Sequence, residues 1–165
     1  MGTKALVIIN EDHQSQSVTQ MYSSMYCQYD GYLEGVGEQI KDFLKDRIVV
    51  NGLSGSTISI SNGMGCLAAS FVSHVKKDAG GWYMTPNKNV NSVLSNDSDV
   101  FVDFVYVISK NYIRAYCLDY DGEVESFRNL FKGSWLEYNE FLNKLSKLNE
   151  TEYVKIVNNL NGESV

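Results

Sequence analysis

Hydrophobic and polar positions near the start of the chain predict two strands. Residues 5–9 form a continuous apolar run, which is typical of a central strand covered on both faces. Residues 18–29 alternate between apolar and polar side chains, as in a strand with one buried face. This alternation predicts two sets of side chains on opposite faces: Met21, Met25, Cys27 and Tyr29 in the core, and Gln20, Tyr22, Ser24, Tyr26 and Gln28 half exposed.

Helical spacing of apolar residues predicts about three helices. The first two stretches are residues 36–48, with Val36, Ile40, Phe43, Leu44 and Ile48 on one side, and residues 66–77, with Leu67, Phe71, His74 and Val75 on one side. The third helix follows Ser134 and Glu137, which have the spacing of a capping box. The tail from Glu150 is expected to add a short helix or to fray.

The second half of the chain predicts a meander of strands. Residues 100–108, 112–118 and 123–127 read as strands joined by tight turns, and residues 82–85 as a short strand. Residues 86–99 form a long polar stretch, which we interpret as a loop that acts as a lid or is mobile. The order of elements predicts a single α+β domain over residues 1–165, with a mostly antiparallel sheet and about three helices packed on one face.

The hairpin at Lys110 and Asn111 fixes which strand residues face the helices. The set predicted to face them is Val102, Phe104, Tyr106, Ile108, Ile113, Ala115 and Cys117. The set predicted on the opposite, open face is Phe101, Asp103, Val105, Val107, Arg114 and Tyr116. An open face with aromatic side chains is typical of protein contacts, so the sequence predicts a partner face of Tyr22, Tyr26, Arg114 and Tyr116 that meets another protein or a second copy in a homo-oligomer.

The stretch between the second strand and the first helix is the strongest candidate for a binding site. It crowds tyrosines, carboxylates and glycines, and its predicted site residues are Tyr29, Asp30, Gly31, Tyr32, Glu34 and Gly35. Glycines permit a tight chain path and close approach of a ligand, while tyrosines offer flat apolar area with a hydroxyl group. The alternative interpretation is a simple turn, because Tyr-Asp-Gly recurs at residues 120–122 in a hairpin position.

A second glycine motif, Asn62-Gly63-Met64-Gly65, precedes the second predicted helix. Its backbone N–H groups could hold an anion such as a phosphate beside the first site. The alternative is a turn that lets the helix pack close to the sheet, because neither a P-loop lysine nor a complete G-x-G-x-x-G motif is present.

Composition narrows the classes of protein that fit. The net charge of -6 disfavours binding to nucleic acid, and no apolar run is long enough to span a membrane, so we expect a cytoplasmic protein. Cys27, Cys66 and Cys117 are expected to be reduced, and no Cys/His spacing indicates a metal site. We expect no cofactor.

No residue is assigned a catalytic role. The chain has no G-x-S-x-G elbow and no H-E-x-x-H motif. His74 is interpreted as a core histidine, and Asp103 as a strand carboxylate that points to water.

Several motifs occur in order along the chain: the start Met-Gly-Thr-Lys-Ala-Leu, the stretch Asp30-Gly31-Tyr32-Leu33-Glu34-Gly35, and Asn62-Gly63-Met64-Gly65-Cys66-Leu67-Ala68-Ala69, followed by Gly81-Trp82-Tyr83 and Gly133-Ser134. Together they resemble a largely uncharacterised family of small proteins encoded by bacteriophages and prophages. The family usually has Arg where this chain has Lys4, and Pro where it has Leu33.

By analogy with other small phage accessory proteins, the resemblance implies an inhibitor of host defence. Such a protein could sequester a nucleotide-type signal or grip a host defence protein. The alternative function is a small nucleotide hydrolase or transferase. Mimicry of DNA ranks last, because 20 acidic residues among 165 are too few.

Overall fold

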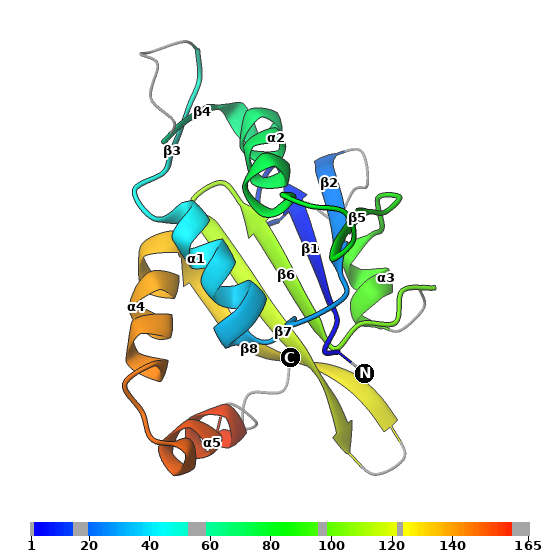
Figure 1. Ribbon diagram of the computed structural model, residues 1–165, viewed down its shortest axis with the longest axis vertical. Coiled ribbons are helices and arrows are strands. Elements are labelled where there is room, and N and C mark those ends of the chain that lie inside the picture. Colours follow the sequence, from blue (N-terminus) through cyan, green and yellow to red (C-terminus); the bar gives the residue numbers. More distant parts are fainter. Residues whose placement is uncertain (1, 15–19, 53–58, 96–98, 122–123, 160–165) are drawn as a thin grey trace.

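The computed structural model describes residues 2–14, 20–52, 59–95, 99–121 and 124–159, and its ribbon is shown in Figure 1. Its elements in chain order are β1 (Ala5–Asn10), β2 (Met21–Cys27), the π-helix η2 (Leu33–Gly37), α1 (Glu38–Leu44), β3 (Ile48–Val50), β4 (Ile60–Asn62), α2 (Gly63–Val75), β5 (Trp82–Met84), α3 (Val90–Leu94), β6 (Phe104–Ser109), β7 (Tyr112–Asp121), β8 (Val124–Ser134), α4 (Trp135–Leu145) and α5 (Glu150–Asn159). The α+β class predicted from the sequence is confirmed.

The described strands form one six-stranded sheet and one two-stranded sheet. The large sheet has the order β5-β2-β1-β6-β7-β8, and β1 pairs parallel with β6 while every other neighbouring pair in it is antiparallel. β3 and β4 pair parallel beside it. β1 is therefore central, and its side chains from Ala5 to Ile9 are all 0% exposed, as the apolar run predicts.

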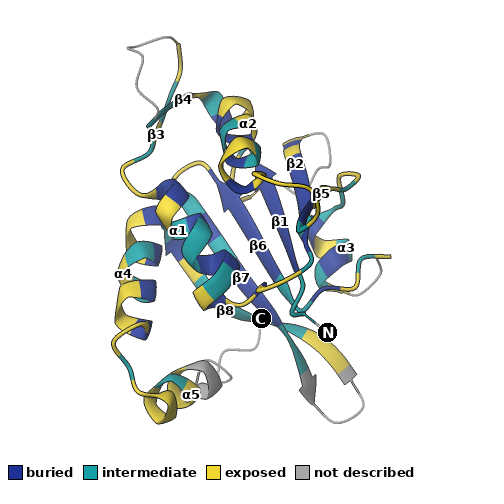
Figure 2. Cartoon of the chain, viewed as in Figure 1, coloured by how far each residue is buried: buried dark blue, intermediate teal, exposed yellow. Residues whose placement is uncertain are grey.

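Helices cover both faces of the large sheet, which differs from the prediction of helices on one face. α1, α2 and α4 pack on the first face, where their apolar side chains join Val7, Ile9 and Tyr106 in the larger core. α3 packs on the second face, where Val90 and Val93 join a smaller core. Figure 2 shows the central strands buried between these layers.

The second face is consequently not the open surface that the sequence predicted. Val105 and Val107 are 0% exposed, and Tyr116 is 8% exposed. The cause is the polar stretch after Pro86, which is not a structureless loop. This stretch contains the five-residue helix α3, which buries two valines. The Asn89 side chain caps α3 by accepting hydrogen bonds from the N–H groups of Asn91 and Ser92. Residues 96–98 of this stretch lie outside the described residues.

A β-bulge explains why Met21 lies on the wrong side of the predicted alternation. Ile9 pairs with Ser23 but Asn10 pairs with Met21, so the register shifts between these positions. Met25 consequently joins the first core, whereas Met21 joins the second. Val102 also belongs to the second core, because β6 begins only at Phe104 and the chain before it does not continue the strand's alternation.

Several predicted boundaries move by a few residues. Ile48, expected at the end of the first helix, begins β3. The strand expected over residues 123–127 is longer and runs to Ser134, where the predicted capping box is present. The tail from Glu150 forms α5, and residues 160–165 lie outside the described part of the chain.

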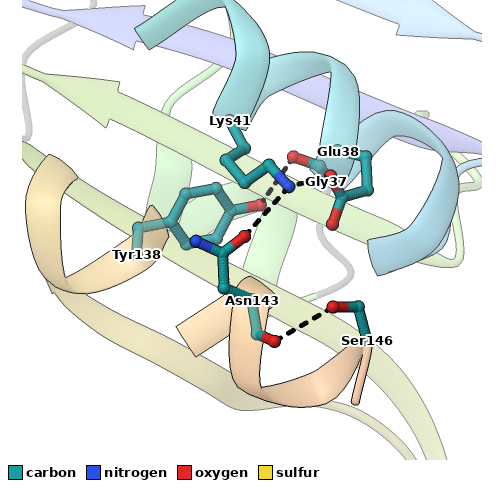
Figure 3. A network of polar contacts seen from close by, with 6 residues as sticks. All are labelled: Gly37, Glu38, Lys41, Tyr138, Asn143 and Ser146. Atoms are coloured by element: carbon teal, nitrogen blue, oxygen red, sulfur yellow. Dashed lines mark hydrogen bonds and ion pairs between the residues drawn. The ribbon is translucent and has the colours of Figure 1, made fainter. Parts of the chain in front are cut away.

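Polar contacts join α4 to the helical segment that follows η2 (Figure 3). The buried Tyr138 hydroxyl donates to the carbonyl oxygen of Gly37 over 3.2 Å, and Lys41 lies between the Glu38 carboxylate and the side-chain oxygen of Asn143. These contacts tie the end of η2 to α4, because Gly37 is the last residue of η2.

Candidate functional site

Hydrogen bonds hold the backbone of the candidate bend, residues 29–35, in one path. The Gly31 N–H donates to the Thr3 carbonyl oxygen over 2.9 Å, and the buried Tyr106 hydroxyl donates to the Gly31 carbonyl oxygen over 2.9 Å. The Val36 N–H donates to the Asp30 carbonyl oxygen over 2.8 Å. Asp30 itself has a positive φ of 54°, which aspartate tolerates better than most residues. The bend is therefore a rigid part of the fold.

Two glycines of the bend are explained by contacts within the chain. A Cβ built on Gly31 would lie 2.6 Å from the carbonyl carbon of Lys4, and one built on Gly35 would lie 2.0 Å from the carbonyl oxygen of Asp30. No side chain fits at such distances. The predicted role of these glycines in letting a ligand approach is thus replaced by a structural role, in which the chain approaches itself.

The polar and aromatic side chains of the bend point outward. Tyr29 is 53% exposed and Tyr32 is 38% exposed, and Asp30 and Glu34 are also exposed. The Tyr32 hydroxyl donates to the Asp30 carboxylate over 3.0 Å, and this hydrogen bond raises the pKa of Tyr32. Burial, followed by a hydrogen bond with Glu34, raises the pKa of Tyr153 on α5. Both carboxylates therefore already have a tyrosine partner.

A small hollow lies next to the bend at the start of β1. Gly2, Thr3, Lys4 and Asp103 line it, and its volume is about 180 Å³. We call it the amino-terminal hollow. The Tyr29 ring lies against its first residue, because a Cβ built on Gly2 would come within 2.5 Å of the Tyr29 Cδ1 atom. The bend is therefore accompanied by a hollow, as a binding site requires.

Asp103 is part of this hollow and does not simply point to water, as the sequence had suggested. Its carboxylate accepts a hydrogen bond from the Lys4 N–H over 2.7 Å, and its own N–H donates to the Lys4 carbonyl oxygen over 3.0 Å. The residue is half-buried. These two contacts align the strand ends that form the hollow.

Further aromatic side chains lie at the same end of the sheet. Tyr26 on β2 pairs with Tyr83 on β5, with 6.2 Å between ring centroids. Burial raises the pKa of Tyr26, and the neighbouring charges of Cys27, Asp103, Tyr29 and Tyr83 raise it further. Tyr83 is 46% exposed. Tyr26 thus neighbours both Asp103 of the hollow and the other two tyrosines, and we call Tyr26, Tyr29 and Tyr83 the aromatic rim.

The second glycine motif lies elsewhere. Gly65 contacts the Tyr22 ring near the start of β2, whereas the bend follows the end of β2. Seven strand residues separate the two ends by on the order of 20 Å. The structure therefore does not bring Asn62, Gly63, Met64 and Gly65 beside the bend, where the sequence analysis had expected them. Gly63 has a positive φ of 76° and Met64 is buried, which fits a turn into α2.

The four residues of the predicted partner face do not form one surface. Tyr22 lies against α2 on the first face of the sheet, whereas Tyr26 and Tyr116 pack against the second core. Arg114 is half-buried on β7, and its Nε and Nη2 atoms are enclosed. Only Tyr26 of this set reaches the aromatic rim.

The sequence analysis missed a larger groove along α2. It has a volume of about 480 Å³, and its polar lining consists of Arg47, Cys66, Ser70, Ser73, His74 and Lys77. His74 is exposed here and its ring lies 5.3 Å from that of Phe43, so it is not the core residue that was expected. The polar side of the helix, at positions 66, 70, 73, 74 and 77, was the signal in the sequence.

Among the described residues, no three His, Cys, Asp or Glu side chains gather closely enough to hold a metal ion. No helix in the described part of the chain has the length and hydropathy needed to cross a bilayer. Cys27 and Cys117 are buried free thiols, and Cys66 is an exposed one.

Comparison with known proteins identified no relative of the chain. No family model, no curated protein and no solved structure matches the chain. The resemblance to phage-encoded proteins stays a prediction, and the functional proposals below depend on the geometry of the structure.

Proposed function

We propose that the chain is a non-catalytic binding protein that grips a protein partner with the bend and the aromatic rim of the amino-terminal hollow. The observation that carries this proposal is the exposure of aromatic rings on a rigid backbone: Tyr29 is 53% exposed and Tyr83 is 46% exposed, while Gly31 is tied to Thr3 and Tyr106. Rigid exposed tyrosines give contact area at a low entropic cost, which is typical of protein recognition.

The size of the hollow favours a protein partner over a nucleotide at this place. Pockets for small ligands usually enclose about 300–1,000 Å³. The amino-terminal hollow has about 180 Å³, enough for one inserted side chain of a partner. Of the two forms of inhibition left open by the sequence, gripping a protein therefore has the better support here.

The charges around the bend indicate what the partner carries. Asp30 and Glu34 are exposed carboxylates, and Asp103 adds a half-buried one inside the hollow. Among the described residues that line the hollow, Lys4 is the basic one. A partner with arginine or lysine side chains in its contact surface fits this arrangement. On the resemblance to phage-encoded proteins, we take a cytoplasmic host defence protein as the partner class.

A plaque assay tests this function directly. The chain is expressed in bacterial strains that each carry one defence system, and the strains are challenged with a phage that the system restricts. We expect the wild-type chain to restore plaques in at least one strain. The double variant Tyr29→Ala/Tyr32→Ala should lose this effect, because truncation of contact tyrosines typically lowers the affinity of an interface by roughly tenfold or more. Leu136→Ala is the matched control, since Leu136 is 68% exposed on α4, away from the bend.

Photo-cross-linking identifies the contact surface in the same strains. A photoreactive residue at position 29 should capture the defence protein, and one at position 136 should not. Full plaque restoration by the double tyrosine variant, or equal capture at both positions, would contradict the proposed surface. Capture of a second copy at position 29 would mean that the bend serves a homo-oligomer.

The enzymatic alternative makes a different prediction. A nucleotide hydrolase or transferase needs a base near a nucleophile, and the described structure places His13 against the Tyr112 ring and His74 against the Phe43 ring. Cys66 and His74 are eight residues apart on α2, which separates their backbones by about 12 Å. Turnover of a nucleotide by the purified chain, lost in His74→Gln, would favour the alternative.

A further inference from the structure

Three polar side chains at one end of the large sheet have enclosed atoms that need a hydrogen-bond partner. Asn10 ends β1 and Ser109 ends β6, and both residues are 0% exposed. Arg114 on β7 is half-buried, with its Nε and Nη2 atoms enclosed. The described residues offer no hydrogen-bond partner to these two nitrogen atoms, to either amide atom of Asn10, or to the Ser109 hydroxyl. Because buried polar atoms are nearly always hydrogen-bonded, this group of side chains calls for an explanation.

The strand registers place the three side chains on the second face, next to one another. Asn10 pairs with Met21 and Arg114 pairs with Val107, and both of these partners belong to the second core. Ser109 is two residues beyond Val107 on β6, so its side chain points to the same face. β1 and β6 run parallel side by side, about 4.8 Å apart, so their last residues are neighbours (Figure 1). Arg114 is the diagonal neighbour of Ser109 on the next strand, within the reach of a long side chain. We call Asn10, Ser109 and Arg114 the strand-end cluster.

The backbone around the strand-end cluster is held in place from two sides. The Trp135 Nε1–H of α4 donates to the Ser109 carbonyl oxygen over 3.1 Å and to the Tyr112 carbonyl oxygen over 3.2 Å. The Lys110 N–H donates to the Glu11 carbonyl oxygen over 3.4 Å, which joins the turn after β6 to the chain after β1. The polar groups of the cluster are therefore carried by a fixed framework, as a preorganised binding site requires.

Arg114 gives the cluster a positive charge. The described structure has ion pairs at Lys41 and Arg128 but none at Arg114. The Nε and Nη2 atoms of a guanidinium lie on one edge, and this edge binds the two oxygen atoms of a carboxylate through two parallel hydrogen bonds. An enclosed charge without a partner is unfavourable. An anion on this edge would therefore satisfy both the charge and the two N–H groups.

We propose that the strand-end cluster binds the carboxylate group of a small molecule, with Arg114 as the bidentate ligand and Asn10 and Ser109 as further donors. A carboxylate presents about four lone-pair positions, which matches donors at Arg114 Nε, Arg114 Nη2, Asn10 Nδ2 and Ser109 Oγ. Because Asn10 and Ser109 are fully enclosed, the ligand is a small molecule and not a side chain of a protein partner. The cluster lies at the end of β1 and the bend near its start, so this site does not depend on the proposed function.

NMR of the isotope-labelled full chain observes the binding groups directly, because the chain has only three arginines. Sodium acetate is titrated against sodium chloride of equal ionic strength at about pH 7, where acetate is ionised. We expect the Arg114 Nε–H and the Asn10 side-chain amide signals to shift along one common saturation curve. The Nε–H signals of Arg47 and Arg128 are internal controls and should not follow this curve.

Glycolate is titrated in the same way, because it adds a hydroxyl group next to the carboxylate. Tighter binding of glycolate than of acetate assigns that hydroxyl to the Asn10 Oδ1 atom, which is the acceptor of the cluster. Equal binding of the two assigns the site to the carboxylate alone. Both outcomes support the proposal.

Two serine variants separate the site from a general effect of buried hydroxyl groups. Ser109→Ala should weaken acetate binding about three- to tenfold through the loss of one charge-assisted hydrogen bond. Ser23→Ala is the matched control, because Ser23 is buried and its hydroxyl also has no partner among the described residues. Ser23 pairs with Ile9 of the first core, so it lies on the other face, and its variant should bind acetate as the wild-type chain does.

Arg114→Lys keeps the charge but loses the bidentate edge, so acetate binding followed at the Asn10 amide should weaken about tenfold or more. The wild-type titration does not depend on the folding of any variant. If acetate moves the Arg114 and Asn10 signals no more than chloride does, or moves all three arginine signals alike, the cluster does not bind a carboxylate and the proposal is overturned. Equal weakening by Ser109→Ala and Ser23→Ala would overturn it as well.

Discussion

Single glycines set the path of the bend through contacts with backbone atoms, not with a ligand. The glycine motif could be recognised in the sequence as a special turn, because three glycines close to each other need a tight chain path. Which atoms approach them could not be predicted. Lys4 is far from Gly31 along the chain, and only the pairing of β1 with β2 brings them together.

We predict that Gly35→Ala lowers the free energy of unfolding by about 3 kcal/mol. The new Cβ would lie 2.0 Å from the Asp30 carbonyl oxygen, so the backbone of the bend must move and lose its hydrogen bond to Val36. Chemical denaturation followed by circular dichroism measures the change. Gly65→Ala is the control, because it places a Cβ in the first turn of α2, 3.3 Å from a Tyr22 ring atom that can shift. A loss in Gly65→Ala as large as that in Gly35→Ala would contradict this account.

Elements with strong local signals were predicted well from the sequence, and elements that depend on long-range pairing were not. The capping box correctly identified Ser134 as the N-cap residue of α4, which begins at Trp135. The helix α3 was missed because five residues, only three of them apolar, give no readable helical period. The bulge in β2 was missed because it exists only in the pairing with β1, and it reverses the side on which Met21 lies.

For the helix α4, we predict that Ser134→Ala lowers the free energy of unfolding by about 1 kcal/mol. The Ser134 hydroxyl accepts from the Glu137 N–H over 3.2 Å, and without it this N–H has no partner in the first turn of α4. Thermal unfolding of the variant measures the loss. Ser146→Ala serves as a control at the other end of α4, where the exposed hydroxyl donates to the Asn143 carbonyl oxygen. We expect Ser146→Ala to change the free energy of unfolding by roughly a few tenths of a kcal/mol.

The whole molecule is a sheet with a core on each face, and this arrangement changes where a partner can bind. Alternation within β6 and β7 correctly assigned Tyr106, Ile108, Ile113 and Ala115 to the helical face. The same alternation could not tell whether the opposite face was open, because the segment that covers it is polar in sequence and contributes only a few valines. The hollows of the described structure accordingly lie away from the sheet faces: the amino-terminal hollow is at the ends of the central strands β1 and β6, and the larger groove is on the exposed side of α2.

The coverage of the second face leads to a prediction about cooperativity. Val93 is 1% exposed and packs in the second core, so Val93→Ala should lower the free energy of unfolding by about 2 kcal/mol through lost burial and a cavity. If α3 were a lid that opens independently of the sheet, the variant would leave global unfolding almost unchanged and speed up hydrogen exchange only within α3. Chemical denaturation and hydrogen exchange of the same variant distinguish these outcomes. Val154→Ala on α5, where the side chain is 48% exposed, is the matched control and should change stability little. We expect the loss to appear in global unfolding, because Val105 and Val107 of the central strand β6 belong to the same core as Val93.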